Sequence, residues 1–237
     1  MFESLSVRRR RAEWMDAPDA DPQLLRDSLA FIRRVNRWLG YTRATLTHLK
    51  QFSRGWQRGE RIRILDVATG SADIPLAILR WAQSAGLDVR VVGADLHPAT
   101  AEAAAEISGE KRLQIVRADA LQLPFDDGSF DYAITNMFLH HLDNDQVVTV
   151  LRNMSRVARR GIVAADLIRN RRAYFWISLF TRFSNPMVRH DAPVSVAQAF
   201  TRDEILKLAD EAGVTYARYY KHFGHRFVLA GEKQGRF

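Results

Sequence analysis

The chain has 237 residues, of which 47% are hydrophobic and 26% charged, as in an ordinary globular protein, and its formal net charge is +8. It contains no cysteine, which excludes a disulfide framework, a thiolate zinc site and a cysteine nucleophile. No apolar run reaches the roughly 20 residues of a membrane-spanning helix, and the arginine run at 8–11 lacks the apolar stretch of a secretory signal, so we expect a cytoplasmic protein.

The first 56 residues precede the first predicted strand. Residues 1 to about 20 combine the arginine run with a short polar stretch and predict disorder. Asp21 followed by proline is typical of a helix start, and Gly40 of its end. A second, shorter helix follows. We therefore expect a disordered basic start and a helical lid at 1–56, ahead of the main domain at 57–237.

The main domain opens on a predicted strand, tight loop and helix. Residues 62–67 are an apolar, β-branched run, and residues 68–72 are all small, so the backbone can turn sharply beside a ligand. The dinucleotide fingerprint Gly-x-Gly-x-x-Gly is not met, because Ala68 and Asp73 stand where its first and third glycines belong. Asp66 and Asp73 flank the loop, which would repel a pyrophosphate and attract a cationic ligand.

The rest of the domain alternates strands and helices and closes on a strand pair. We predict strands at 89–95, 113–118, 130–135, 161–167, 214–220 and 226–230, and helices at 98–107, from 143 and from 201 to 212. The segment at about 170–200 reads as irregular, basic and aromatic. The expected fold is α/β: a Rossmann-like, seven-stranded, mostly parallel sheet with an antiparallel C-terminal strand, helices on both faces and an N-terminal helical extension.

Aspartates end three consecutive predicted strands. They are Asp66, Asp95 and Asp119. The carboxyl ends of parallel strands meet at one crevice, where α/β sheets bind nucleotide-like ligands. A carboxylate at the end of the second strand can accept two hydrogen bonds from ribose hydroxyls. The sequence therefore predicts a site for a nucleoside that carries positive charge.

Two motifs resemble those of class I S-adenosylmethionine-dependent methyltransferases. Leu65-Asp66-Val67-Ala68-Thr69-Gly70-Ser71-Ala72 resembles their first motif, roughly Leu-Asp-hydrophobic-Gly-x-Gly-x-Gly, with Ala68 and Ala72 replacing two glycines. Phe130-Asp131 followed by Leu139-His140-His141-Leu142 resembles a signature of the small-molecule enzymes, including those that act on quinone rings. The resemblance covers about 62–167. Residues 36–40 and 188–195 resemble a bacterial subgroup with phenolic, quinone or polyketide-type substrates.

This resemblance implies a cofactor and its contacts. S-adenosyl-L-methionine would bind to Asp66, Ala68, Thr69, Gly70, Ser71, Asp73, Asp95, Leu96, Asp119, Ala120 and Asn136. In the family the acid at Asp95 binds the ribose, and the one at Asp119, with the residue after it, contacts the adenine amino group.

Catalysis is expected to depend on positioning and on removal of a proton. The sulfonium already activates the methyl carbon, so proximity can supply much of the rate, but a phenolic acceptor must still be deprotonated, a role suited to histidine. The candidate catalytic residues are His141, His140, His190 and Arg189. One of the adjacent histidines would face the crevice; Asp191 could orient His190, and Arg189 could pair with an acidic group of the acceptor. No metal is expected, since the adjacent histidines lack the i, i+4 spacing of a helical metal site.

The two additions to the alternating core are expected to close the acceptor site. They supply Trp38, Leu39 and Tyr41 from the first helices, and Phe175, Trp176, Phe180 and Phe183 from 170–200. The second addition also fits a surface that rests on a membrane, with arginines on its flanks, or ordinary core packing.

The favoured function is methyl transfer from S-adenosylmethionine to a small, largely apolar acceptor of phenolic, quinone or polyketide type, with O-methylation as the favoured chemistry. Two alternatives stay open. The positive charge suits an RNA or other nucleic-acid methyltransferase, although Asn136-Met137-Phe138-Leu139 lacks the prolines usual in enzymes that methylate base nitrogens. A cofactor-binding protein without transfer activity is the other. We expect no nucleic-acid partner, and peripheral membrane contact only for a lipophilic acceptor; the sequence does not determine the oligomeric state.

Overall fold

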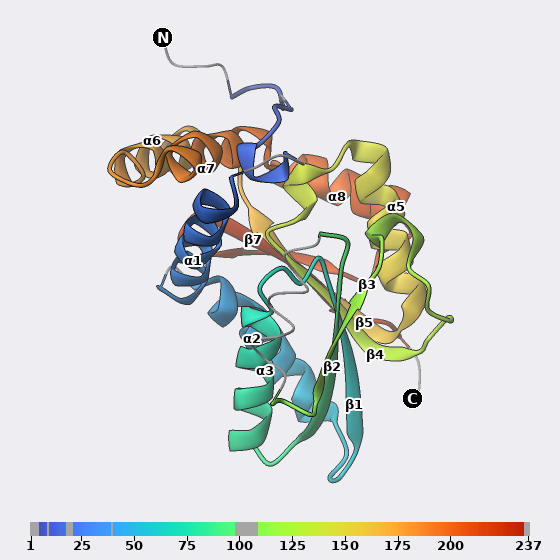
Figure 1. Cartoon of the computed structure of the whole chain (residues 1–237). Helices are drawn as coiled ribbons and strands as arrows, with labels where there is room; N and C mark the ends of the chain where they lie inside the picture. The colour runs from blue at the N-terminus through green and yellow to red at the C-terminus, as the bar shows by residue number, and fades with distance from the viewer. Residues whose placement is uncertain (1–4, 9, 18–20, 39, 98–108, 235–237) are drawn as a thin grey trace.

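The structure is a computed structural model that describes residues 5–8, 10–17, 21–38, 40–97 and 109–234. Its centre is a seven-stranded sheet in the order β3-β2-β1-β4-β5-β7-β6 (Figure 1). The strands are β1 (Arg61–Val67), β2 (Asp88–Asp95), β3 (Leu113–Arg117), β4 (Phe130–Asn136), β5 (Ala158–Leu167), β6 (Arg218–His222) and β7 (Arg226–Glu232). The first five strands are parallel to one another, and β7 runs antiparallel to both of its neighbours. The expected fold class is confirmed.

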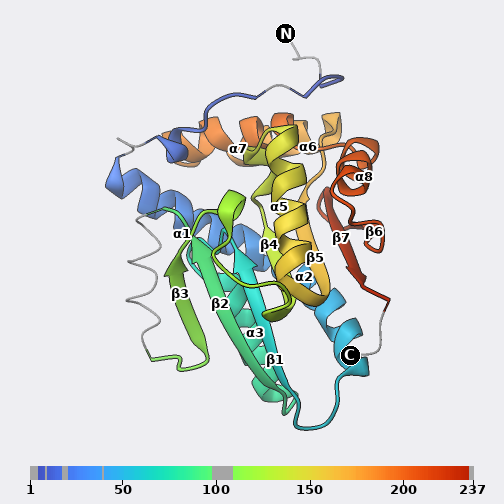
Figure 2. The ribbon, with the colours of Figure 1, turned by 90° about the vertical axis from the view of Figure 1, so that its right-hand side faces the viewer.

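Helices cover both faces of this sheet (Figure 2). One apolar layer joins the sheet to α2 (Tyr41–Phe52) and α3 (Asp73–Ser84), and the other joins it to α5 (Asn144–Val157) and α8 (Arg202–Glu211). The central strands are buried on both faces, as expected for parallel strands between two helical layers. This packing holds the carboxyl ends of β1, β2 and β4 level, with Val67 beside both Ala94 and Thr135.

Several predicted boundaries differ from the observed ones. The last strand pair begins at Arg218 rather than near 214, and β5 begins at Ala158 rather than at 161. The first helix, α1 (Pro22–Trp38), ends before Gly40 as expected, and Gly40, in the left-handed conformation, is also the N-cap of α2. The predicted helix at 98–107 lies outside the described residues.

The segment at about 170–200 is helical rather than irregular. Asn170 begins α6 (Arg171–Phe180) by accepting a hydrogen bond from the backbone of Ala173, and Asn185 begins α7 (Pro186–Gln198) in the same way. The helical pattern of α7 is masked in the sequence because Pro193 lies inside it and its apolar residues do not follow one face.

The start of the chain also differs from the expected disorder, for residues 5–8 and 10–17. This segment, which we call the N-terminal strap, ends in a short 3-10 helix, η1 (Trp14–Asp16), and crosses over α7. Arg8 donates hydrogen bonds to backbone carbonyls of His140, Leu142 and Gln198. The composition of this segment predicts disorder because the residues that hold it in place lie far away in the sequence and leave no local pattern.

Candidate active site

The loop between β1 and α3 adopts the backbone that the glycine-rich motif requires, although two glycines are replaced. Ala68 and Ala72 have φ of 58° and 54°, in the left-handed region, and Gly70 between them has φ of 51°. A side chain built on Gly70 would meet nothing within 4 Å, so this part of the loop faces open space. Gly93 on β2 is needed for another reason, since a Cβ there would lie 2.8 Å from Thr69 Oγ1.

Asp66 lies beneath this loop and is buried. Its Oδ2 accepts a hydrogen bond of 2.7 Å from Thr69 Oγ1. Burial raises the pKa of Asp66 to about 8; the bond from Thr69 opposes this shift, whereas the charges of Asp73 and Asp95 add to it. Ser71 Oγ lies 3.3 Å from Asp73 Oδ1 at the start of α3. A cation bound here would favour the ionised form of Asp66.

Asp95 and Asp119 lie at the same edge of the sheet. Asp95 accepts backbone hydrogen bonds from Gly70 and from His97, each of 2.8 Å, so it joins the loop to the end of β2. Asp119 caps the short 3-10 helix η3 (Ala120–Gln122) through the backbone N–H of Leu121. Each carboxylate oxygen has a further lone pair for a ligand hydroxyl or amine. Leu96, next to Asp95, is 53% exposed.

Asn136 ends β4, the strand beside β1. Its Oδ1 accepts a hydrogen bond of 2.5 Å from Thr45 on α2. Its Nδ2 is buried and has no hydrogen-bond partner among the described residues. Three acids and an open loop thus lie at one edge of the sheet, and their acceptor oxygens and negative charge fit a nucleoside with a positively charged tail. In this arrangement the acids would hold S-adenosylmethionine by its charge and its ribose.

His140 forms a buried pair with Asp166, a residue that we did not predict. His140 Nδ1 lies 2.6 Å from Asp166 Oδ1, and the His140 backbone N–H donates to Oδ2 at 3.0 Å. Burial raises the pKa of Asp166, but the charge of His140 and the hydrogen bonds outweigh burial and hold the pKa below its ordinary value. A carboxylate only accepts, so Nδ1 carries a proton, and in the neutral imidazole the lone pair is on Nε2.

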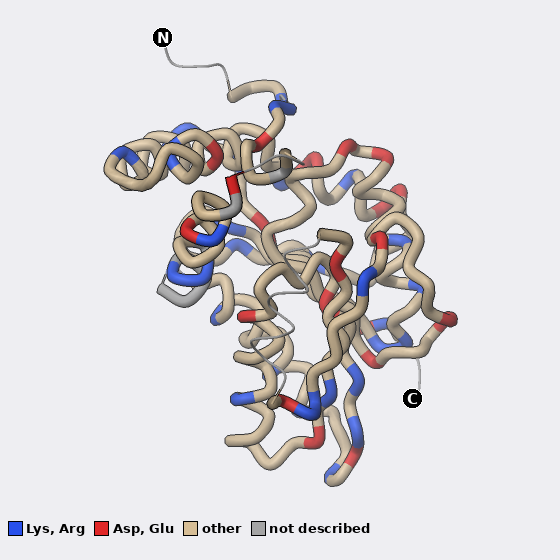
Figure 3. Tube along the Cα trace, in the orientation of Figure 1, with Lys and Arg blue, Asp and Glu red and all other residues tan. Residues whose placement is uncertain are grey.

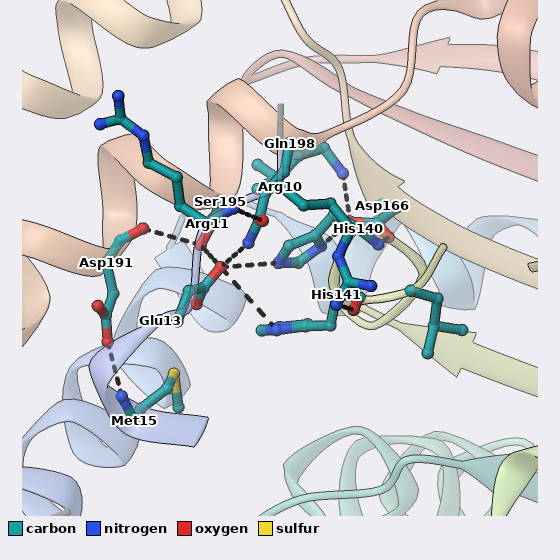
Figure 4. A network of polar contacts seen from close by, with 12 residues as sticks. Arg10, Arg11, Glu13, Met15, His140, His141, Asp166, Asp191, Ser195 and Gln198 are labelled. Carbon is teal, nitrogen blue, oxygen red and sulfur yellow. Dashed lines mark hydrogen bonds and ion pairs between the residues drawn. The ribbon is translucent and has the colours of Figure 1, made fainter. Parts of the chain in front are cut away.

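Glu13 brings the N-terminal strap to the two histidines (Figure 4). Its Oε1 lies 3.9 Å from His140 Nε2 and 3.9 Å from His141 Nδ1. The same oxygen accepts hydrogen bonds from Ser195 and Gln198 of α7. One ligand atom from each of Glu13, His140 and His141 lies within 4.8 Å of the others, a spacing that could hold a metal ion. The absence of a metal therefore stays a prediction.

His190 lies on α7, outside the pair formed by His140 and Asp166. Its ring stacks on Trp14 of the strap with 4.3 Å between centroids, and its Nδ1 lies 2.7 Å from Asp191 Oδ1. Asp191 also accepts the backbone N–H groups of Trp14 and Met15. The expected contact between His190 and Asp191 is therefore present, but these contacts also fasten the strap. Arg189 is exposed on the same helix.

The aromatic residues of α6 do not line a closed pocket. Phe175, Trp176 and Phe180 are 49%, 47% and 71% exposed, and Phe183 after the helix is 92% exposed. The helix packs against α7 and projects away from the sheet (Figure 1). Of the first helices, Tyr41 is buried, whereas the surroundings of the Trp38 side chain and Leu39 lie outside the described residues. No helix of the described part of the chain is long and apolar enough to cross a membrane.

Sequence reasoning missed Glu13 and Asp166. Asp166 had a usable signal, since it is the single charged residue near the end of the apolar strand β5 and so lies at the same sheet edge as the other acids. No signal in the sequence pointed to Glu13, because it lies in a segment whose composition predicts disorder.

The fold agrees with the comparisons with known proteins. A family profile described as a methyltransferase domain matches residues 64–161, from β1 into β5. Residues 64–161 are therefore a methyltransferase domain, and the chain as a whole is similar in sequence and fold to class I S-adenosylmethionine-dependent methyltransferases.

One relative in sequence and two in structure illustrate the similarity. Demethylmenaquinone methyltransferase of Bacillus subtilis (strain 168) is 27% identical over 182 residues, which cover 70% of this chain and 76% of that protein. A SAM-dependent methyltransferase from Aquifex aeolicus has a similar fold, with a TM-score of 0.60 at 17% identity over 90% of this chain and 98% of that one. The CMeT domain of the citrinin polyketide synthase reaches a TM-score of 0.69 at 11% identity, over 93% and 59% of the two chains.

Proposed function

We propose that this methyltransferase acts on a small, largely apolar acceptor of phenolic, quinone or polyketide type, and that it methylates oxygen. The observation that carries the proposal is the buried pair of His140 and Asp166 at the carboxyl ends of β4 and β5. A neutral imidazole with Nε2 unprotonated is a suitable base for a phenol. The names of the relatives concern a quinone and a polyketide synthase, which supports the acceptor class.

The residues of the chain have distinct roles in this proposal. When bound, held by Asp66, Asp95 and Asp119, S-adenosylmethionine would supply an activated methyl group to an oxygen of the acceptor. Nε2 of His140 takes the acceptor proton, and Asp166 stabilises the resulting imidazolium through Nδ1. Glu13, 3.9 Å from Nε2, lies where it can stabilise the same positive charge. The strap and α7 cover the histidines and so exclude water.

Turnover of a phenol panel tests the base assignment. We expect His140→Gln to lower turnover by roughly 100-fold or more while leaving cofactor affinity unchanged, and higher pH to restore part of the rate by ionising the phenol without a base. His190→Gln is the matched comparison and should lower turnover much less, because His190 packs against the strap. A larger loss of turnover in His190→Gln than in His140→Gln would show that His190, and not His140, is the base.

A second part of the proposal concerns where the enzyme finds a lipophilic acceptor. Phe175, Trp176 and Phe180 are exposed on α6, and Arg171 and Arg172 lie at its first turn. An apolar face beside cations is the arrangement of helices that lie on anionic membranes. Basic residues elsewhere are spread over several elements rather than gathered in one cluster (Figure 3), so a nucleic-acid partner is not part of the proposal.

A further inference from the structure

The inner face of α2 is unexpectedly polar for a helix that covers a sheet. Tyr41, Thr45 and His48 lie one turn apart along it, and all three are buried. This face packs against β5 and β7. An apolar stripe would serve stability better, since each buried polar group needs a partner.

Arg226 lies opposite this face and is the largest fully buried side chain among the described residues, with 1% of its surface exposed. It begins β7, beside Leu167 at the end of β5. Neither its Nε nor its Nη1 has a hydrogen-bond partner, and no carboxylate pairs with it, in the described part of the chain. Its guanidinium carbon lies 3.7 Å from the centre of the Tyr41 ring, which provides a cation–π contact but no acceptor for the N–H groups.

Two further unpaired donors lie in the same row. The Tyr41 hydroxyl is buried without a partner among the described residues, and burial raises the pKa of Tyr41, so the hydroxyl stays protonated. One helical turn further, Thr45 orients Asn136, whose Nδ2 also lacks a partner. In the sheet Asn136 lies opposite Ala165 and Arg226 lies opposite Leu167, the two neighbours of Asp166 on β5.

We propose that Arg226, Tyr41 and Asn136 form a subsite that binds an anionic oxygen group of the acceptor, a carboxylate or an ionised second phenol. The unpaired atoms of these three side chains are the Tyr41 hydroxyl, the Asn136 Nδ2 group and two N–H groups of the Arg226 guanidinium, while Asn136 Oδ1 is already bonded to Thr45. All four can donate and one group is positively charged, which favours an oxyanion over a neutral amide or an amine. A buried, unpaired guanidinium is costly for stability, so a ligand that pairs with it explains its presence better than packing does.

This subsite would define the acceptor more narrowly than the proposed function, on which it rests. The acceptor would carry an acidic group near the oxygen that receives the methyl group. Because α2 covers Arg226, entry requires movement at the amino end of that helix, where Gly40 has φ of +89° and lies against Arg226 Nη1. Once enclosed, the charge-assisted hydrogen bonds are shielded from water and gain strength.

Calorimetric titration of the full-length protein, saturated with S-adenosylhomocysteine, tests the subsite without turnover. The probes are salicylate, an acidic phenol, and salicylamide, its neutral analogue. We expect salicylate to bind at least about tenfold more tightly than salicylamide. Arg226→Met should remove this preference and Tyr41→Phe should reduce it, whereas Arg218→Met, at an exposed position of β6, should keep it.

Thermal unfolding separates a binding role from a structural one. A binding role predicts that Arg226→Met keeps or raises the unfolding midpoint, because a buried unpaired charge is removed. If Arg226→Met lowers the unfolding midpoint, the variant Arg226→Lys distinguishes the two roles. A binding role predicts that this variant still prefers salicylate to salicylamide, at reduced affinity. Equal affinities for the two probes, no binding of salicylate, or a preference that survives Arg226→Met would overturn the subsite. Failure of phenol turnover with this preference intact would instead overturn the proposed O-methylation alone.

Discussion

At the scale of single residues, Asp66 combines a raised pKa with a place beneath the loop between β1 and α3, where we propose that the cofactor binds. A bound cation favours the carboxylate, so binding should release a proton, and cofactor affinity should increase as the pH rises towards 8 and level off above it. Isothermal titration in buffers of different ionisation enthalpy measures this release. In Asp66→Asn the affinity should fall and the proton release should disappear; an unchanged pH profile would exclude Asp66 from the cofactor site.

The same pKa has a consequence for stability. The ordinary pKa of the carboxyl is 3.8 and the folded value is about 8, so the folded state holds the proton more tightly than the unfolded state. The contribution to the free energy of unfolding is therefore complete below pH 4 and is lost as the pH rises through 8. Asp66→Asn should flatten this decline in urea unfolding experiments carried out across that range.

Ala68 offers a direct test of the loop conformation. An alanine at φ of 58° is strained relative to glycine. We expect Ala68→Gly to raise the free energy of unfolding by about 0.5–1 kcal/mol and to preserve cofactor binding. Ala82→Gly, within α3, is the control and should be destabilising, because glycine is unfavourable inside a helix. If both variants lose stability to the same extent, Ala68 is not strained.

At the scale of elements, α6 has an exposed aromatic face without a partner in the described structure. Sedimentation with vesicles should show binding to phosphatidylglycerol and much less to phosphatidylcholine, because both the apolar face and the flanking arginines contribute. Phe180→Glu should abolish this binding without loss of cofactor affinity. Phe125→Leu, inside the fold near α5, is a control for general destabilisation and should bind vesicles normally. Binding of both lipids alike, or of neither, would refute the membrane contact.

The elements also show what the sequence could predict. The β1 strand, its loop and the acids at Asp66, Asp95 and Asp119 follow from local patterns, since strand periodicity and the parallel topology together place them at one edge. The helix α7 could not be predicted in this way, because Pro193 and the scattered apolar residues of the helix obscure the helical period. The aromatic residues of α6 were assigned to a pocket because composition does not reveal which way a helix faces.

At the scale of the whole molecule, the site depends on contacts between distant parts of the chain. Glu13 meets Ser195 across 182 positions, and His140 meets Asp166 across 26. Such contacts cannot be predicted from local sequence patterns, and a single sequence contains no covariation from which to infer them. The contacts of the strap and the burial of Arg226 could therefore not be predicted from the sequence, although Tyr41, Asn136 and most of the fold could.

The strap can be removed separately from the rest of the extension. A deletion to about Phe52 would also remove Leu49 and Phe52, which pack under the sheet, so it would disturb the core. Deletion of residues 1–20 avoids this. We expect cofactor affinity to stay within about twofold and phenol turnover to fall at least about tenfold, because the turn that carries His140 loses its contacts with Arg8 and Glu13. Glu13→Gln in the full-length chain should reproduce part of that loss; unimpaired turnover after the deletion would show that the strap does not serve catalysis.

The central claim is methyl transfer to a phenolic oxygen. The most direct measurement uses S-adenosylmethionine labelled with ¹³C in the methyl group, a panel of acidic phenols, dihydroxynaphthalenes and hydroxyquinones, and NMR of the products. A methyl carbon bound to oxygen resonates far from one bound to a ring carbon, so one spectrum identifies the atom that receives the group. Our account predicts an aryl methyl ether that forms with the wild-type protein and is strongly reduced with His140→Gln. A labelled methyl group on a ring carbon, or label on no member of the panel, would contradict it.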